Sequence, residues 1–158
     1  MKKLLSLFLI TILWSSFSFA QNIATQKVYA LRLKAGDDLK IKLSEFVKDK
    51  NIQAGYIITC VGNLKQATLR FVNKNETLTW KENFEIVSLV GTLCKDGNHL
   101  HISIADKEGK TVGGHLMEGN IVMTATELVI GDATEFSFSR ETDPETKNRE
   151  LKITPAEK

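Results

Sequence analysis

The sequence has 158 residues, with 21 basic and 19 acidic side chains, two cysteines and three histidines. Its formal net charge of +2 excludes the strongly basic composition of a protein that binds nucleic acid through overall charge. The length is that of a single domain with one hydrophobic core.

The first twenty residues are typical of a secretory signal peptide. Lys2 and Lys3 precede an apolar run over residues 4–14, and residues 18–20 (Ser-Phe-Ala) supply small side chains for cleavage. The run is too short for a membrane-spanning helix, which needs about 20 apolar residues. We therefore expect an exported protein, periplasmic or secreted, that begins at Gln21 and keeps no stable membrane span. Cleavage removes two basic residues and no acidic one, so the mature chain is formally neutral, which disfavours nucleic acid as a partner.

The mature chain is predicted to be an α+β domain, a largely antiparallel sheet of about seven strands with one main helix. An apolar stripe over residues 39–51 follows a Gly-Asp-Asp turn and predicts the helix. Alternating or continuous apolar runs predict strands at residues 28–33, 56–61, 66–72, 84–93, 99–105, 111–116, 121–130 and 134–139, with a loop or weak strand at 78–80.

The domain is expected to span residues 28–140. Residues 141–158 are charged, contain two prolines and lack a sustained apolar period, so they are predicted to form an extended or disordered tail.

Three residues inside the apolar runs carry further expectations. Cys60 and Cys94 would allow one disulfide in an oxidising compartment, or they would remain as small buried hydrophobic side chains. Gly91, inside a predicted strand, indicates a bulge or a close approach of another backbone.

All three histidines lie in one short stretch around a predicted hairpin. Residues 106–110 (Asp-Lys-Glu-Gly-Lys) suit a three-residue loop with Gly109 in the left-handed position. This register places His101 directly opposite His115 and His99 on the same face of the sheet. A two-residue turn would shift the register by one residue and turn His115 to the opposite face.

Three convergent imidazoles with room for water are the ligand set of an open divalent metal site, with zinc as the default and iron, nickel or copper allowed. His99, His101 and His115 are therefore candidate metal ligands. The alternative is a group of metal-free histidines that hydrogen-bond across a cleft or a subunit interface. Adjacent glycines weaken a strand, so Gly113 and Gly114 indicate a bulge or the close approach of a ligand or another chain, and they are candidate ligand-binding residues.

The histidine stretch, NHLHISIADKEGKTVGGHLMEG followed by ATELVIGD, resembles the PPC domain, the plants and prokaryotes conserved domain. Further similar segments are RLKAGDDL, TCVGNLKQATLR and FEIVSLVGTL, so that the resemblance covers about residues 28–140. It implies an α+β fold, a homotrimer, and a position for the three histidines near a cleft between subunits. Members joined to AT-hooks in plants carry a DNA-binding label.

This chain departs from the DNA-binding members in several ways. It has no Arg-Gly-Arg core of an AT-hook, and residues 82–87 (Glu-Asn-Phe-Glu-Ile-Val) lack the Gly and Arg of a plant partner-contact segment. The expected function is therefore an exported, stand-alone, homotrimeric module that binds a metal or a small ligand.

Two alternatives remain open. One is a metal-dependent enzyme, with Glu118 or Asp106 as conceivable bases. The other is a DNA-binding protein, whose basic surface would come from Lys65, Arg70, Lys74 and Lys81.

Overall fold

The computed structural model describes residues 26–72 and 75–157. The predicted signal peptide and its cleavage position lie outside these residues. Among them, no helix has the length and apolar character to cross a membrane.

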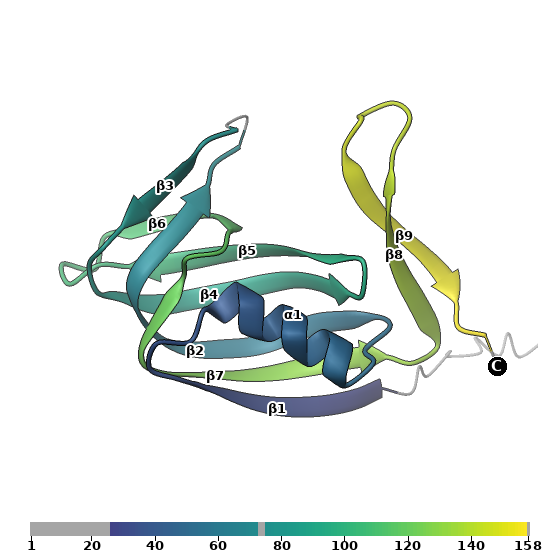
Figure 1. Ribbon diagram of the computed structural model, residues 1–158, viewed down its shortest axis with the longest axis horizontal. Helices are drawn as coiled ribbons and strands as arrows, with labels where there is room; N and C mark the ends of the chain where they lie inside the picture. Colours follow the sequence, from purple (N-terminus) through teal and green to yellow (C-terminus); the bar gives the residue numbers. More distant parts are fainter. Residues whose placement is uncertain (1–25, 73–74, 158) are drawn as a thin grey trace, which may run out of the picture.

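The described residues form one helix and nine strands (Figure 1). The elements in chain order are β1 (Gln26–Lys34), α1 (Leu39–Asp49), β2 (Gly55–Arg70), β3 (Thr77–Trp80), β4 (Phe84–Cys94), β5 (Gly97–Ala105), β6 (Thr111–Leu116), β7 (Ile121–Ala133), β8 (Phe136–Thr142) and β9 (Arg149–Pro155). Every strand pairing is antiparallel, as the sequence predicts.

The helix forms where the apolar stripe and its cap predict it. The Asp38 side chain accepts hydrogen bonds from the backbone N–H groups of Lys40 and Ile41, at 2.9 and 3.1 Å, and so satisfies two donors of the first turn. The buried residues of the helix are spaced four apart and face the sheet; they are Leu39, Leu43 and Val47. Burial of this face against the sheet, rather than helix propensity, therefore holds α1 in place.

The seven-stranded sheet has the order β1-β7-β2-β4-β5-β6, with β3 paired to β2. Strand β2 also pairs with β6 at Leu69 and Leu116, so the sheet curls back on itself around the core. The sequence predicted two strands separated at Gly62, and this was wrong. Gly62 has a φ of +145° and lies at a register shift inside one continuous strand, so it bends β2 without ending it.

The face of the sheet opposite the core carries several exposed aliphatic side chains, beside the exposed pair Arg32 and Glu127. Five β-branched residues alternate with core residues on β1, β2 and β4 and are 47–57% exposed: Val28, Ile58, Val61, Val87 and Val90. We call these residues the valine face. The histidines share this side of the sheet, because His101 is paired with Val90.

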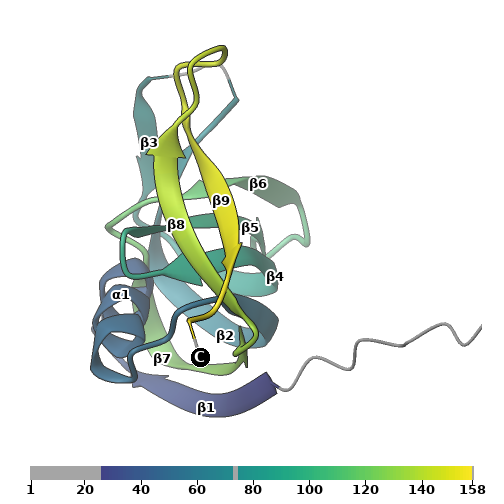
Figure 2. The same ribbon diagram turned by 90° about the vertical axis from the view of Figure 1, so that its right-hand side faces the viewer.

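Residues 136–155 form a separate two-stranded hairpin (Figures 1 and 2). Its first strand, β8, lies where a strand was predicted at residues 134–139, whereas β9 falls in residues 141–158, which the sequence indicated as an extended or disordered tail. Phe138 is paired with Ile153, and the backbone N–H of Phe138 donates to the carbonyl of Gln53 at 3.0 Å. Asp143 starts the connecting turn, where its side chain accepts from two backbone N–H groups at 2.8 Å. The sequence does contain a signal for this hairpin, the Asp143-Pro144 turn between two short alternating runs. The charged composition of residues 141–158 nevertheless led to the prediction of a tail.

Both cysteines are buried and unbridged. Of the two alternatives, the structure therefore shows the buried thiols. Burial raises the pKa of the Cys60 thiol to about 12.

Candidate metal centre

The hairpin between β5 and β6 has the predicted three-residue loop. The backbone N–H of Asp106 donates to the Lys110 carbonyl at 2.9 Å, and Gly109 has a φ of +80°. The resulting register pairs His101 with His115. The two-residue turn is thereby excluded, and the three imidazoles share one face.

The three imidazole rings form a compact triangle. The ring centroids of His101 and His115 are 4.5 Å apart, those of His99 and His101 are 4.9 Å apart, and those of His99 and His115 are 5.2 Å apart. One nitrogen from each ring can be chosen so that all three lie within 4.8 Å of one another. Tetrahedral zinc with bonds of about 2.1 Å needs nitrogens about 3.4 Å apart. Small side-chain rotations would close this difference, so the residues present fit a divalent ion.

Gly91 on β4 supports the backbone beneath His99. It has a φ of +140°, and a Cβ built on it would lie 2.0 Å from the His99 carbonyl oxygen. Only glycine allows β4 to approach β5 this closely, which confirms the predicted close backbone approach.

Gly113 and Gly114 allow close packing against neighbouring strands of the same chain. A Cβ on Gly114 would lie 2.9 Å from the carbonyl oxygen of Arg70, and one on Gly113 would lie 3.1 Å from that of Ile102. The double glycine therefore lets β6 fit between β2 and β5. That these glycines also contact a ligand stays a prediction.

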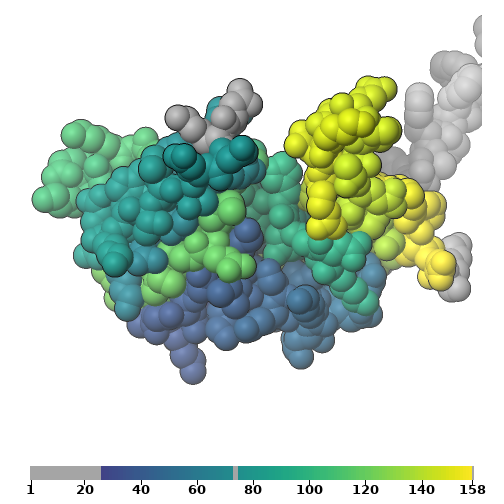
Figure 3. All heavy atoms as spheres, turned by 45° about the horizontal axis from the view of Figure 1, so that its top comes forward, coloured from purple at the N-terminus to yellow at the C-terminus, as the bar shows by residue number. Residues whose placement is uncertain are grey.

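A cleft of about 1150 Å³ opens beside the histidines, between the C-terminal end of β2 and the hairpin β8–β9 (Figure 3). His99 and His115 lie on its floor, and the hairpin contributes residues of one wall. The cleft is lined by four basic residues (Lys40, Arg70, Arg140 and Arg149) and two acidic residues (Asp96 and Glu150). The cleft thus carries an excess of positive charge in a mature chain that is predicted to be neutral.

A smaller hollow of about 390 Å³ also borders the histidines. It is lined partly by apolar side chains, among them Val72 and Val90, and by His101, Gly113 and Gly114. His115 therefore borders both the charged cleft and a more apolar hollow.

The surroundings favour the neutral form of His99 and His115. Partial burial lowers the pKa of His99, and the positive charges of His101, Arg140 and Arg70 lower it further. Partial burial also lowers the pKa of His115, with Arg70 as the next cause. Because neutral imidazole is the form that coordinates a metal, both residues are prepared for binding near neutral pH.

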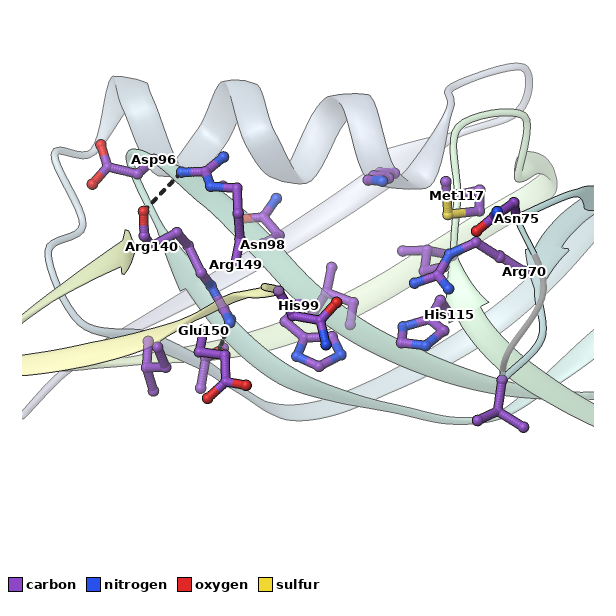
Figure 4. A pocket seen from close by; sticks show the side chains of 18 residues that line it. Arg70, Asn75, Asp96, Asn98, His99, His115, Met117, Arg140, Arg149 and Glu150 are labelled. Carbon is purple, nitrogen blue, oxygen red and sulfur yellow. Dashed lines mark hydrogen bonds between the residues drawn. The ribbon is translucent and has the colours of Figure 1, made fainter. Parts of the chain in front are cut away.

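Arg140 is held in place at the edge of the cleft, close to His99 (Figure 4). Its Nη2 donates to Thr92 Oγ1 at 2.6 Å, and its carbonyl accepts from Arg149 Nη2 at 3.0 Å. Its Nε is buried without a hydrogen-bond partner in the described part of the chain. Sequence reasoning missed Arg140 and Arg149, because it placed the second half of their hairpin in a tail.

The remaining candidates lie elsewhere. The Asp106 side chain accepts from the backbone N–H groups of Glu108 and Lys110, so it stabilises the turn. Glu118 is exposed and does not line the cleft. Of the proposed basic surface, Arg70 lines the cleft, Lys65 and Lys81 are exposed away from it, and Lys74 lies outside the described residues.

Comparison with known families agrees with this architecture. Residues 21–134 match the Plants and Prokaryotes Conserved (PCC) domain. A curated relative, the bifunctional protein GlmU of Synechococcus sp. (strain JA-3-3Ab), is 46% identical over 127 residues, which is 80% of this chain and 20% of that protein. The chain therefore spans about one fifth of the length of this relative.

Three solved structures share the fold. A hypothetical protein from Salmonella cholerae-suis has 37% identity and a TM-score of 0.82, covering 85% of this chain and 97% of the other. A metal-containing protein from Archaeoglobus fulgidus has 27% identity and a TM-score of 0.68, with coverages of 80% and 93%. A candidate DNA-binding protein from Bacteroides thetaiotaomicron has 26% identity and a TM-score of 0.69, with coverages of 81% and 96%.

Proposed function

This chain belongs to the Plants and Prokaryotes Conserved domain family, and we propose that it is a metal-binding module that holds a divalent ion, zinc by default, on His99, His101 and His115. The observation that carries the proposal is the group of three imidazole nitrogens within 4.8 Å of one another on an open face. The metal-containing relative from Archaeoglobus fulgidus supports it.

The geometry suits an ion with a free coordination position. Two of the three histidines are exposed and the third is half-buried, so the protein would supply three ligands on one side and leave the other side to water or a ligand. When bound, zinc would supply Lewis acidity at that open position. The lowered pKa values of His99 and His115 keep their nitrogens available to the ion at neutral pH.

Binding is proposed in preference to catalysis. A hydrolytic metal site needs a general base near the metal-bound water. Asp106 is occupied by the hairpin turn, and Glu118 does not line the cleft. Neither of these two acids is therefore placed for that role. Asp96 and Glu150, which line the cleft, are the acids that the enzyme alternative would have to use.

We also propose that the protein is exported and assembles as a homotrimer. Export follows from the predicted signal peptide alone. Self-association is supported by the valine face, because apolar patches of this kind on a soluble protein mark interaction surfaces. The trimer, as the resemblance implies, would place the histidines near a subunit boundary.

Metal analysis and calorimetry on untagged protein test the site. Zinc should bind at about one ion per chain at neutral pH. His101→Ala or His115→Ala should weaken it by more than about 100-fold, because loss of a ligand costs more than loss of the groups that orient one. His99→Ala should weaken it less, if water or another subunit fills the position.

Ser103→Ala is the matched control, since Ser103 is two residues after His101 on the same strand and is not one of the three candidate ligands. It should bind zinc as the wild type does. Failure of zinc, nickel and iron to bind the wild-type protein at neutral pH would refute the proposal and leave an interface or organic-ligand role for the histidines.

A further inference from the structure

The hairpin β8–β9 lies beyond the residues that match the family, which end at residue 134. It nevertheless forms one wall of the cleft beside the histidines and contributes Arg140, Arg149, Glu150 and Leu151 to its lining. The hairpin therefore gives this chain a feature of the site that the matched domain does not contain.

Two arginines from opposite sides of the cleft flank the histidines. Figure 4 shows Arg70 beside His115 and Arg140 on the side of His99. The three candidate ligands thus lie between two guanidinium groups.

Contacts within the chain hold Arg140 in place. Its hydrogen bond to Thr92 and the contact of Arg149 with its carbonyl fix the side chain and its backbone. A guanidinium carries five N–H donors, so the bond to Thr92 leaves others for a ligand. An oxyanion held by such a fork gains two parallel charge-assisted hydrogen bonds, with little further ordering of the side chain.

We propose that Arg70 and Arg140 bind the oxyanion group, carboxylate or phosphate, of a small molecule that occupies the cleft and completes the coordination of the metal ion. This inference rests on the proposed metal site. A small molecule is favoured over a polynucleotide because the cleft is bounded by walls and its volume of about 1150 Å³ is close to that of small-ligand sites. Asp96 and Glu150 also line it and would repel an extended polyanion.

Calorimetry on the zinc-loaded protein, freed of excess zinc, tests the proposal with two probes: inorganic phosphate and acetate. At least one should bind, with an affinity that falls as salt rises. Arg70→Gln and Arg140→Gln should each raise its Kd about tenfold, as expected for loss of a charge-assisted hydrogen bond. The probe that binds more tightly identifies the oxyanion class. Arg140→Lys, which keeps the charge but loses the fork, should recover part of the affinity.

The matched control is Arg32→Gln, an exposed arginine on β1 that faces Glu127 at 3.9 Å and does not line the cleft. It should change neither zinc nor anion binding. Zinc stoichiometry and the melting temperature, measured on every variant, separate loss of the anion contact from loss of the metal or of the fold.

Other outcomes overturn one proposal or both. If zinc binds but the anion Kd is unchanged in both arginine variants, or neither probe binds at millimolar concentration, the oxyanion site is wrong. If zinc fails to bind the wild type, the metal site is wrong. The same anion titration of metal-free protein and its arginine variants then tests whether Arg70 and Arg140 bind an oxyanion. Tighter binding of duplex DNA than of either probe, lost in both variants, would replace the small molecule by a nucleic acid.

Discussion

Gly91 and Gly97 provide a test of how closely β4 supports the backbone of His99. Both glycines have a φ near +140°, at +140° and +137°, so replacing either with alanine forces a side chain into a backbone region that only glycine adopts freely. That strain is worth about 1–3 kcal/mol at each site. The surroundings differ, because the Cβ at Gly91 would lie 2.0 Å from the His99 carbonyl oxygen, whereas nothing lies within 4 Å of the Cβ at Gly97.

Gly91→Ala should therefore carry an additional cost of about 1–3 kcal/mol for pushing the two strands apart. For a domain of this size each kcal/mol lowers the melting temperature by roughly 3–6 °C. Gly91→Ala should thus melt roughly 3–18 °C below Gly97→Ala in the same buffer without metal. Thermal unfolding followed by circular dichroism measures this difference.

The metal site supplies a second measurement. Displacement of the His99 carbonyl in Gly91→Ala should move its imidazole and raise the Kd for zinc, whereas Gly97→Ala should leave the Kd unchanged. Equal melting temperatures for the two variants, or equal zinc affinities, would show that the close contact with His99 is absent in solution and would refute the reasoning.

Three further predictions concern the histidines, the thiols and the assembly. The pKa values of His99 and His115 lie below 6.5, so both stay neutral as the pH falls through 6.5. Bound zinc should therefore be released only as the pH falls further, toward about 5, which equilibrium dialysis with metal analysis measures; release above pH 6.5 would contradict the lowered values. In the metal-free protein the same groups contribute stability that is present above pH 6.5 and is lost as the pH falls through the lowered pKa values. With a pKa of about 12 for Cys60, about one thiol in ten thousand is ionised at pH 8, so a thiol reagent should modify Cys60 only after unfolding; rapid modification of the native protein would argue against its burial. Light scattering should give about three times the mass of the mature chain at micromolar concentration. A monomeric mass would contradict the proposal that the valine face mediates self-association.

The histidine hairpin could be predicted from sequence because its turn residues fix the register. Gly109 in a five-residue polar stretch selects one loop length, and that loop length determines which residue faces His101. The single helix was predictable for a similar reason, since the capping Asp38 and the apolar stripe agree.

The cleft could not be predicted in the same way, because its walls come from distant segments. The curl of β2 places Arg70 at the cleft, and the hydrogen bond between Phe138 and Gln53 docks the hairpin that carries Arg140. No local sequence pattern predicts the curl or the docking. At Gly62 the local pattern exists but is ambiguous, because a glycine inside a strand pattern fits a strand end and a bulge equally well.

Strand β7 joins the first strand of the sheet to the rest of it. Gln26 is paired with Ala133 and Gly55 with Asp132, so strands formed early in the chain must wait for a partner near its end. Contacts of such long range form slowly, in milliseconds to seconds, because a large loop must close before they stabilise the chain. At a synthesis rate of about 5–20 residues per second, β1 also remains unpaired for several seconds after it leaves the ribosome. The topology therefore leaves β1 without its sheet partner until synthesis is nearly complete, and its open strand edge can pair with other chains during that time.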